Sequence, residues 1–158
     1  MRKEPTNSLN KRALTAWRIS WSISMGILLL LAIAVLSFVI IFDFPRWIGI
    51  LTVIAVIILS IFYIVIYPKL QWKKWKYEVH EAEVDIQHGV FLVKRTLIPM
   101  VRVQHVDTQQ GPLLRKFRLK SVTISTAATM HEIPALDEEE ADLLRDRISS
   151  LARVDEDE

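Results

Sequence analysis

The chain has 158 residues, of which 51% are hydrophobic, and its formal net charge at pH 7 is +2. It contains no cysteine, which excludes a disulfide framework, a cysteine-ligated iron-sulfur cluster and a thiol nucleophile. Residues 1–68 carry 6 Lys or Arg against 2 Asp or Glu, whereas residues 69–158 carry 14 against 16, so the basic excess does not indicate a nucleic-acid-binding domain.

The chain begins with a basic segment, residues 1–18, in which a single acid accompanies five Lys or Arg. Pro5, Asn7, Ser8 and Asn10 disfavour a long ordered element here. We therefore expect this segment to be a basic cytoplasmic tail.

Two uncharged, strongly apolar runs follow, at about residues 19–42 and 47–67. A membrane-spanning helix needs about 20 apolar residues, and both runs reach that length. Because only residues 43–46 separate them, the sequence predicts a two-helix transmembrane hairpin over residues 19–68 with both ends on one side. A cleaved signal peptide is rejected, since the first run is longer than a typical signal core and a second run follows directly.

Basic residues also follow the second apolar run, whereas the hairpin tip carries one acid and one base. The positive-inside bias then predicts a cell-membrane protein with two spans and both termini in the cytoplasm. The basic residues after the second run are candidate contacts to the membrane surface, although topology alone would also explain them: Lys69, Lys73, Lys74 and Lys76.

Aromatic residues gather near the ends of both runs, where they suit the membrane interface or pack on neighbouring side chains: Trp17, Trp21, Trp47, Tyr63, Tyr67, Trp72 and Trp75. Gly26 and Gly49 favour generic helix packing, because neither belongs to a GxxxG pair. No ionisable residue lies at the middle of either run, so nothing in them indicates a proton relay or transport site.

The pattern changes to alternation after residue 76, which predicts β-strands. Val84 and Ile86 interleave with polar residues, Gly89 supplies a turn with positive φ, and a second strand is expected from residue 90 to Pro99. The apolar phase then slips by one residue between Val103 and residue 106, which predicts a β-bulge near His105.

The remainder of the chain predicts a mixed α+β domain, residues 69–154, followed by an acidic tail, residues 155–158. Residues 113–117 have helical spacing and predict a short helix or irregular bridge. Strands are expected at residues 119–126 and 130–133. Asp137 and Glu140 have the spacing of a capping box for a last helix, whose apolar face is Ala141, Leu144, Ile148 and Leu151.

Several motifs in this domain resemble a known family: WKY at 75–77, RVQHVD at 102–107, QGPL at 110–113, Phe117, Leu119 and VTIST at 122–126. They are similar to the bacterial pleckstrin-homology-like (PH-like) family, also called the bacterial membrane-flanked domain, and in particular to its short YdbS-like members. The resemblance covers residues 70–151 and the preceding pair of spans. It implies a curved antiparallel sheet or partial barrel capped by the C-terminal helix, and a membrane-attached interaction module. One departure is Arg118, which stands where many relatives have Gly.

Motifs for catalysis are lacking in the sequence. The four histidines, His80, His88, His105 and His131, show no metal-ligand spacing, and there is no nucleophile elbow or glycine-rich phosphate loop. The carboxylates of residues 138–142 suit the start of a helix better than an acid-base pair. We therefore predict no catalytic, cofactor-binding or metal-binding residues, and no enzymatic activity.

A second basic group is the candidate edge for a partner, although a solvated edge would also explain it: Arg115, Lys116, Arg118 and Lys120. The predicted function is a non-enzymatic, membrane-anchored interaction or scaffold protein. Its partner would be a protein, either a related multi-domain membrane protein or a second copy of this chain, and not nucleic acid. The alternatives are a module that senses anionic lipid and an accessory subunit of a membrane transporter or enzyme.

Overall fold

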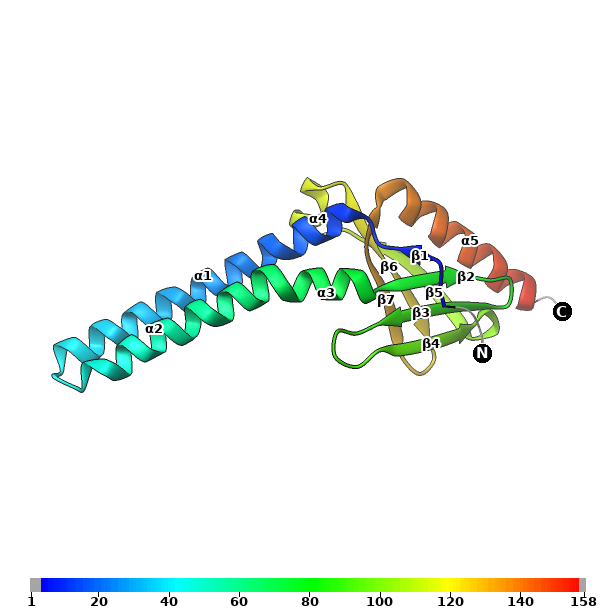
Figure 1. Ribbon diagram of the computed structural model, residues 1–158. Coiled ribbons are helices and arrows are strands. Elements are labelled where there is room, and N and C mark those ends of the chain that lie inside the picture. Colours follow the sequence, from blue (N-terminus) through cyan, green and yellow to red (C-terminus); the bar gives the residue numbers. More distant parts are fainter. Residues whose placement is uncertain (1–3, 157–158) are drawn as a thin grey trace. The chain divides into compact units, whose positions relative to one another are not determined.

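The computed structural model describes residues 4–156 and divides into two compact units (Figure 1). Trp17–Lys69 forms a helical unit, and the segments before and after it form a mainly β unit.

The helical unit contains two long apolar helices. The first is α1 (Lys11–Ile41), and the second runs without a break through α2 (Arg46–Ile61), a π-helical turn (Phe62–Ile66) and α3 (Tyr67–Lys74). Both are long and apolar enough to cross a membrane. The predicted hairpin is confirmed. The first helix begins before the first apolar run, at Lys11, and the second helix continues past the second run to Lys74.

The hairpin tip is closed by a regular helix-ending motif. The N–H of Phe44 donates to Val39 O at 3.0 Å and the N–H of Asp43 donates to Ile40 O at 3.5 Å. Asp43 has φ +52, the left-handed conformation that this motif requires, which Asp tolerates better than most residues. The motif therefore ends α1 at Ile41, four residues before Pro45.

The two long helices pack closely on each other. A Cβ atom on Gly49 would lie 2.6 Å from Leu36 Cδ1 and 3.1 Å from Leu36 Cα, so a larger residue would require Leu36 to shift, whereas Gly26 has nothing within 4 Å. Trp21 stacks on Tyr63 with 4.9 Å between ring centroids and meets Tyr67 edge-on at 5.6 Å. These three aromatic side chains thus pack on one another. Packing on neighbours was one of the two interpretations of the aromatic pattern, beside a position at the membrane interface.

The β unit consists of two antiparallel sheets and a C-terminal helix. Sheet A has the order β1 (Asn7–Ser8), β2 (Lys76–Val79), β3 (Glu83–His88) and β4 (Lys94–Pro99). Sheet B has the order β5 (Val103–Gln109), β6 (Leu119–Thr126) and β7 (Met130–Asp137). A 3-10 turn (Met100–Arg102) joins the sheets, and α4 (Pro112–Lys116) joins β5 to β6. The predicted PH-like arrangement is confirmed, and the sheets do not close into a barrel.

Helix α5 (Glu138–Glu156) packs against β5, β6 and β7 of sheet B and closes the hydrophobic core (Figure 1). Ala141, Leu144 and Ile148 are buried as predicted, but Leu151 is half-buried and Ala152 completes the face. The helix reaches Glu156, so part of the expected acidic tail belongs to its last turn, and residues 157–158 lie outside the described residues.

The N-terminal segment is more ordered than its sequence indicates. Asn7 pairs with Tyr77 and Ser8 with Lys76, so residues before the first span add a strand to sheet A. Leu9 is 2% exposed. The expectation of a simple tail therefore differs from the structure, because Leu9 supplies an apolar anchor that composition alone does not reveal. Residues 1–3 lie outside the described residues.

Two strand boundaries also differ from expectation. Residues 90–93 were expected to open a strand, but they form an exposed loop, and β4 starts at Lys94. Strand β7 runs past residue 133 to Asp137, because a bulge with Ala135 at φ +53 lets it continue. The positive φ of Gly89, at +118, and the register shift between Val103 and His105 were both predicted correctly.

Candidate interaction surfaces

The juxtamembrane lysines lie on α3 and β2 and have different surroundings. Lys69, Lys73 and Lys74 are exposed and make no ion pair within residues 4–156. Lys76 is half-buried, and its Nζ lies 2.8 Å from Glu4 Oε2. This hydrogen bond and the charge of Lys76 hold the pKa of the Glu4 carboxyl below its usual value. Lys76 therefore fastens the N-terminal segment, and the other three remain open to a lipid or a partner.

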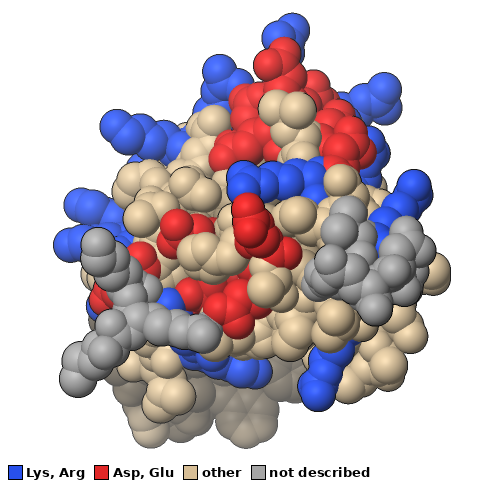
Figure 2. Space-filling view, turned by 90° about the vertical axis from the view of Figure 1, so that its right-hand side faces the viewer, with Lys and Arg blue, Asp and Glu red and all other residues tan. Residues whose placement is uncertain are grey.

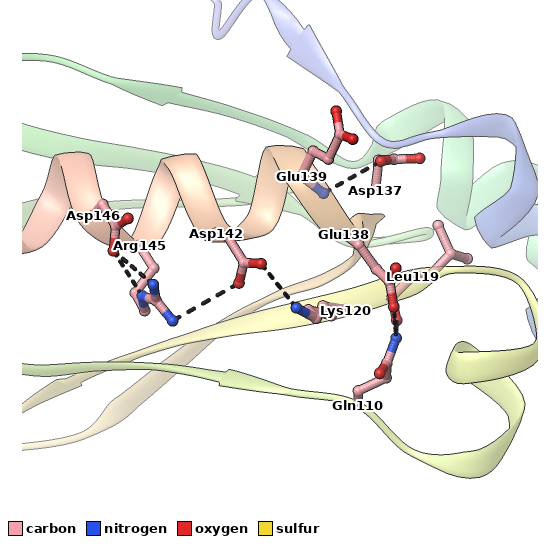
Figure 3. Close-up of polar contacts among 9 residues, drawn as sticks. All are labelled: Gln110, Leu119, Lys120, Asp137, Glu138, Glu139, Asp142, Arg145 and Asp146. Carbon is pink, nitrogen blue, oxygen red and sulfur yellow. Dashed lines mark hydrogen bonds and ion pairs between the residues drawn. The ribbon is translucent and has the colours of Figure 1, made fainter.

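The second basic group also contains both residues with an ion pair and residues without one. Arg115, Lys116 and Arg118 are exposed on α4 and the turn after it, and their side chains have no ion pair within the described residues. Lys120 instead donates to Asp142 Oδ2 on α5 at 2.9 Å (Figure 3). This bond lowers the pKa of Asp142. The candidate edge is thus reduced to three residues, and Lys120 helps to hold α5.

A polar network places α4 beside the start of α5. Gln110 Nε2 donates to Leu119 O at 3.0 Å and to Glu138 Oε1 at 2.6 Å (Figure 3). The N–H of Glu138 donates to Arg118 O at 3.3 Å. The exposed cations of α4 therefore project from a well-supported turn. The QGPL motif marks Gln110, but no local pattern indicates its bond to Glu138, which lies 28 residues further along the chain.

The expected capping box at the start of α5 is only half formed. Asp137 Oδ1 accepts a bond from the N–H of Glu139 at 3.4 Å, but Glu140 accepts a bond from the Tyr77 hydroxyl. Burial, and then the Glu140 carboxylate, raise the pKa of Tyr77 well above its usual value. Glu140 thus connects α5 to sheet A, a long-range role that the local spacing does not indicate.

A buried ion pair crosses the outer face of sheet A. Asp85 on β3 is 2% exposed, and both its oxygens lie 3.0 Å from Arg95 Nε on β4. Arg95 Nη2 lies 2.5 Å from Asp85 Oδ2. The forked geometry satisfies the buried carboxylate, so this pair has a structural explanation.

The end of the β unit at the β2–β3 turn is acidic. The N–H of His80 donates to Glu83 O at 2.9 Å and closes the turn, and Glu81 is exposed beside it. Figure 2 views the molecule from the side on which this turn lies in Figure 1, and acidic side chains gather in the middle of that face. An anionic membrane surface would not favour this end.

The gap between the two sheets is lined mainly by β4, the 3-10 turn and the β6–β7 connection. It has a volume of ≈ 510 Å³, and Leu97, Val101 and His131 are among its lining residues. Burial, together with the charges of Lys94 and His88, lowers the pKa of His131. None of the basic candidates from the sequence lines this groove. Within residues 4–156, no three His, Asp or Glu side chains gather as a metal site.

The family profile described as "Bacterial PH domain" matches residues 15–152. The chain belongs to this family. The family predicted from the sequence motifs is therefore confirmed.

Two relatives come from Bacillus subtilis (strain 168). The chain is 51% identical over its full length to UPF0699 transmembrane protein YdbS, of which it covers 99%. It is also 26% identical over 83 residues, half of this chain, to UPF0699 transmembrane protein YdbT, of which the match covers 17%. No solved structure matches. The chain is thus a membrane protein that carries a bacterial PH domain.

Proposed function

We propose that this protein is a non-enzymatic, membrane-anchored scaffold whose bacterial PH domain binds a protein partner at the inner surface of the cell membrane. The observation that carries the proposal is the surface of α4. Arg115, Lys116 and Arg118 are exposed there and have no ion pair within the described residues, while Lys120 next to them is used internally. Open cations on a supported turn suit an acidic protein surface.

The pairing of β1 with β2 supports the proposed topology. Asn7 precedes the first span and Tyr77 follows the second, and the two residues are register partners in one sheet. Their pairing supports a topology in which both flanks of the hairpin lie on the same side of the membrane. The exposed Lys69, Lys73 and Lys74 favour the cytoplasmic side by the positive-inside bias.

The proposed partner is a longer membrane protein that carries a related domain. The match to YdbT supports this choice, because part of the present chain resembles a small part of a much longer transmembrane protein of the same organism as YdbS. A second copy of this chain is the other candidate.

The test is gentle detergent extraction of the tagged full-length protein from its native membrane, followed by identification of what co-purifies. We expect a longer bacterial PH domain protein to co-purify, Arg115→Ala to reduce its yield and Arg115→Lys to retain most of it. The matched control is Arg147→Ala, which removes an exposed arginine from α5. Equal yields with Arg115→Ala and Arg147→Ala would contradict the role of α4.

Sensing of anionic lipid is the second candidate function, favoured by the exposure of Lys73 and Lys74. Under this alternative, Arg115→Ala would leave the membrane behaviour unchanged. Replacing Lys73 and Lys74 by Gln would weaken the preference of the full-length protein for anionic over neutral lipid in nanodiscs. Retention of that preference in the Gln variant would contradict this alternative.

A further inference from the structure

We propose that the loop between β3 and β4, residues 89–93, inserts Phe91 and Leu92 into the interfacial layer of the membrane that the chain spans. This contact goes beyond the proposed binding of a protein partner, because it assigns a lipid-binding role to a different segment. It would fix the orientation of the bacterial PH domain relative to the bilayer.

The loop displays its apolar side chains in an unusual way. Phe91 is 83% exposed and Leu92 84% exposed, and Val93 next to them is 45% exposed. Large apolar residues rarely stand adjacent and nearly fully exposed at the tip of a hairpin unless another apolar phase covers them. We therefore expect another apolar phase to cover Phe91 and Leu92.

The loop is also held in a defined shape. Gly89 has φ +118, and a Cβ atom built there would lie 2.0 Å from Leu92 O. Only glycine permits the backbone to pass so close to Leu92. The turn is thus compact and presents the two apolar side chains from a fixed base.

Strand pairing places this loop at one particular end of sheet A. Lys76, the first residue of β2, pairs with Ser8 of β1 on one side and with Gln87 of β3 on the other. The loop starts just after Gln87, α1 starts just after Ser8, and α3 ends just before Lys76. Both connections to the spans therefore leave sheet A at the end that carries Phe91 and Leu92.

Two side-chain contacts hold this end together. Trp72 Nε1 donates to Leu9 O at 2.9 Å, which joins the two connections to the spans. Trp75 stacks on His88, at the base of the loop, with 5.9 Å between ring centroids. The loop is thus fastened directly to the segment that enters the membrane.

The lengths of α3 and of the β3–β4 loop allow Phe91 and Leu92 to reach the membrane interface. At a rise of about 1.5 Å per residue, α3 separates the start of β2 from the last apolar turn of the span by at most about 12 Å. The loop projects two to three residues beyond β3, which is about 7–10 Å of extended chain. Chain length alone therefore lets Phe91 and Leu92 reach the headgroup and upper acyl region.

The charges around the loop also favour an anionic membrane as the phase that covers Phe91 and Leu92. Lys73, Lys74 and Lys94 are exposed at this end of the unit, whereas Glu81 and Glu83 lie at the opposite end of β2 and β3. Apolar side chains flanked by cations are the usual composition of a segment that binds an anionic membrane interface. A protein groove would account for the apolar pair but not for the cations beside it.

The chain offers a direct test because it contains no cysteine. Phe91→Cys, Leu92→Cys and, as a matched control, Leu143→Cys each place one thiol at an exposed apolar position, since Leu143 on α5 is 71% exposed. Each full-length variant is labelled with an environment-sensitive fluorophore and placed in nanodiscs of phosphatidylcholine and phosphatidylglycerol. Thermal unfolding of each variant checks that the fold is retained.

We expect probes at 91 and 92 to emit at shorter wavelength than the probe at 143, to lose quenching by aqueous iodide and to gain quenching by bromine-labelled lipid. Equal iodide quenching at all three positions would overturn the proposal. Shielding from iodide without quenching by the brominated lipid would also overturn it, and would indicate that a second copy of the chain covers the loop.

Discussion

Among residues 4–156, three residues other than glycine have a backbone conformation in the left-handed region. Asp43, Arg118 and Ala135 hold positive φ angles, at +52, +53 and +53. An L-residue in this region costs about 1–2 kcal/mol, although Asp lowers the cost through its short polar side chain. Arg118 has no such compensation. Its position after α4 is therefore a strained one.

The first prediction is that Arg118→Gly stabilises the domain. Glycine adopts φ +53 freely, but its more flexible unfolded chain offsets part of the gain, which leaves a net increase in unfolding free energy of about 0.5–1 kcal/mol. The measurement is the shift in the unfolding midpoint of the purified full-length protein.

Arg118→Ala is the control for this prediction, because it removes the same charge but keeps a Cβ atom at the left-handed position. It should give no gain in stability. A similar gain from both variants would mean that charge, and not backbone strain, determines the cost at this position.

We expect α5 to stabilise the domain through its buried face. Ile148 is fully buried against sheet B, whereas Leu143 on the same helix is 71% exposed. Ile148→Ala should lower the unfolding free energy by about 2–5 kcal/mol through lost burial and a residual cavity. Leu143→Ala should change it by no more than about 0.5 kcal/mol. The unfolding midpoints of the two variants provide the comparison, and equal losses would show that α5 does not dock through the Ile148 face.

The elements that the sequence predicted well are those with a repeating pattern. The two apolar spans, the alternation of β6 and the helical face of α5 each follow from local periodicity. Arg115, Lys116 and Arg118 were found exposed, as a surface edge requires, because charged residues near turns seldom pack inside.

The elements that the sequence missed depend on contacts between distant residues. Strand β1 has two residues and exists because β2 offers an open edge. The apolar run at residues 90–93 resembles a strand, but Gly89 turns it away from the sheet. Lys76 and Lys120 fall in basic clusters of the sequence, but the fold brings Glu4 beside Lys76 and Asp142 beside Lys120. No local pattern contains this information.

The pairing of β1 with β2 and the lysines after the second span favour one topology for the full chain, with both termini in the cytoplasm. A reporter that is active only outside the cytoplasm should be silent when fused after Glu158 and active when inserted at Pro45, in the hairpin tip. The reverse pattern would place the bacterial PH domain outside the cell and would contradict both the topology and the proposed site of partner binding.

The two-residue strand β1 also sets an order of events during synthesis. Ser8 leaves the ribosome 68 positions before Lys76, its partner in the sheet. At roughly 5–20 residues per second, the N-terminal segment waits about 3–14 s for that partner, while both spans are made and inserted. Leu9, buried in the finished protein, faces water or a chaperone during this interval. Strand β1 is made before both spans and is therefore among the last elements to reach its native contacts, so a bulky domain fused ahead of it would interfere with maturation before it affected any finished surface.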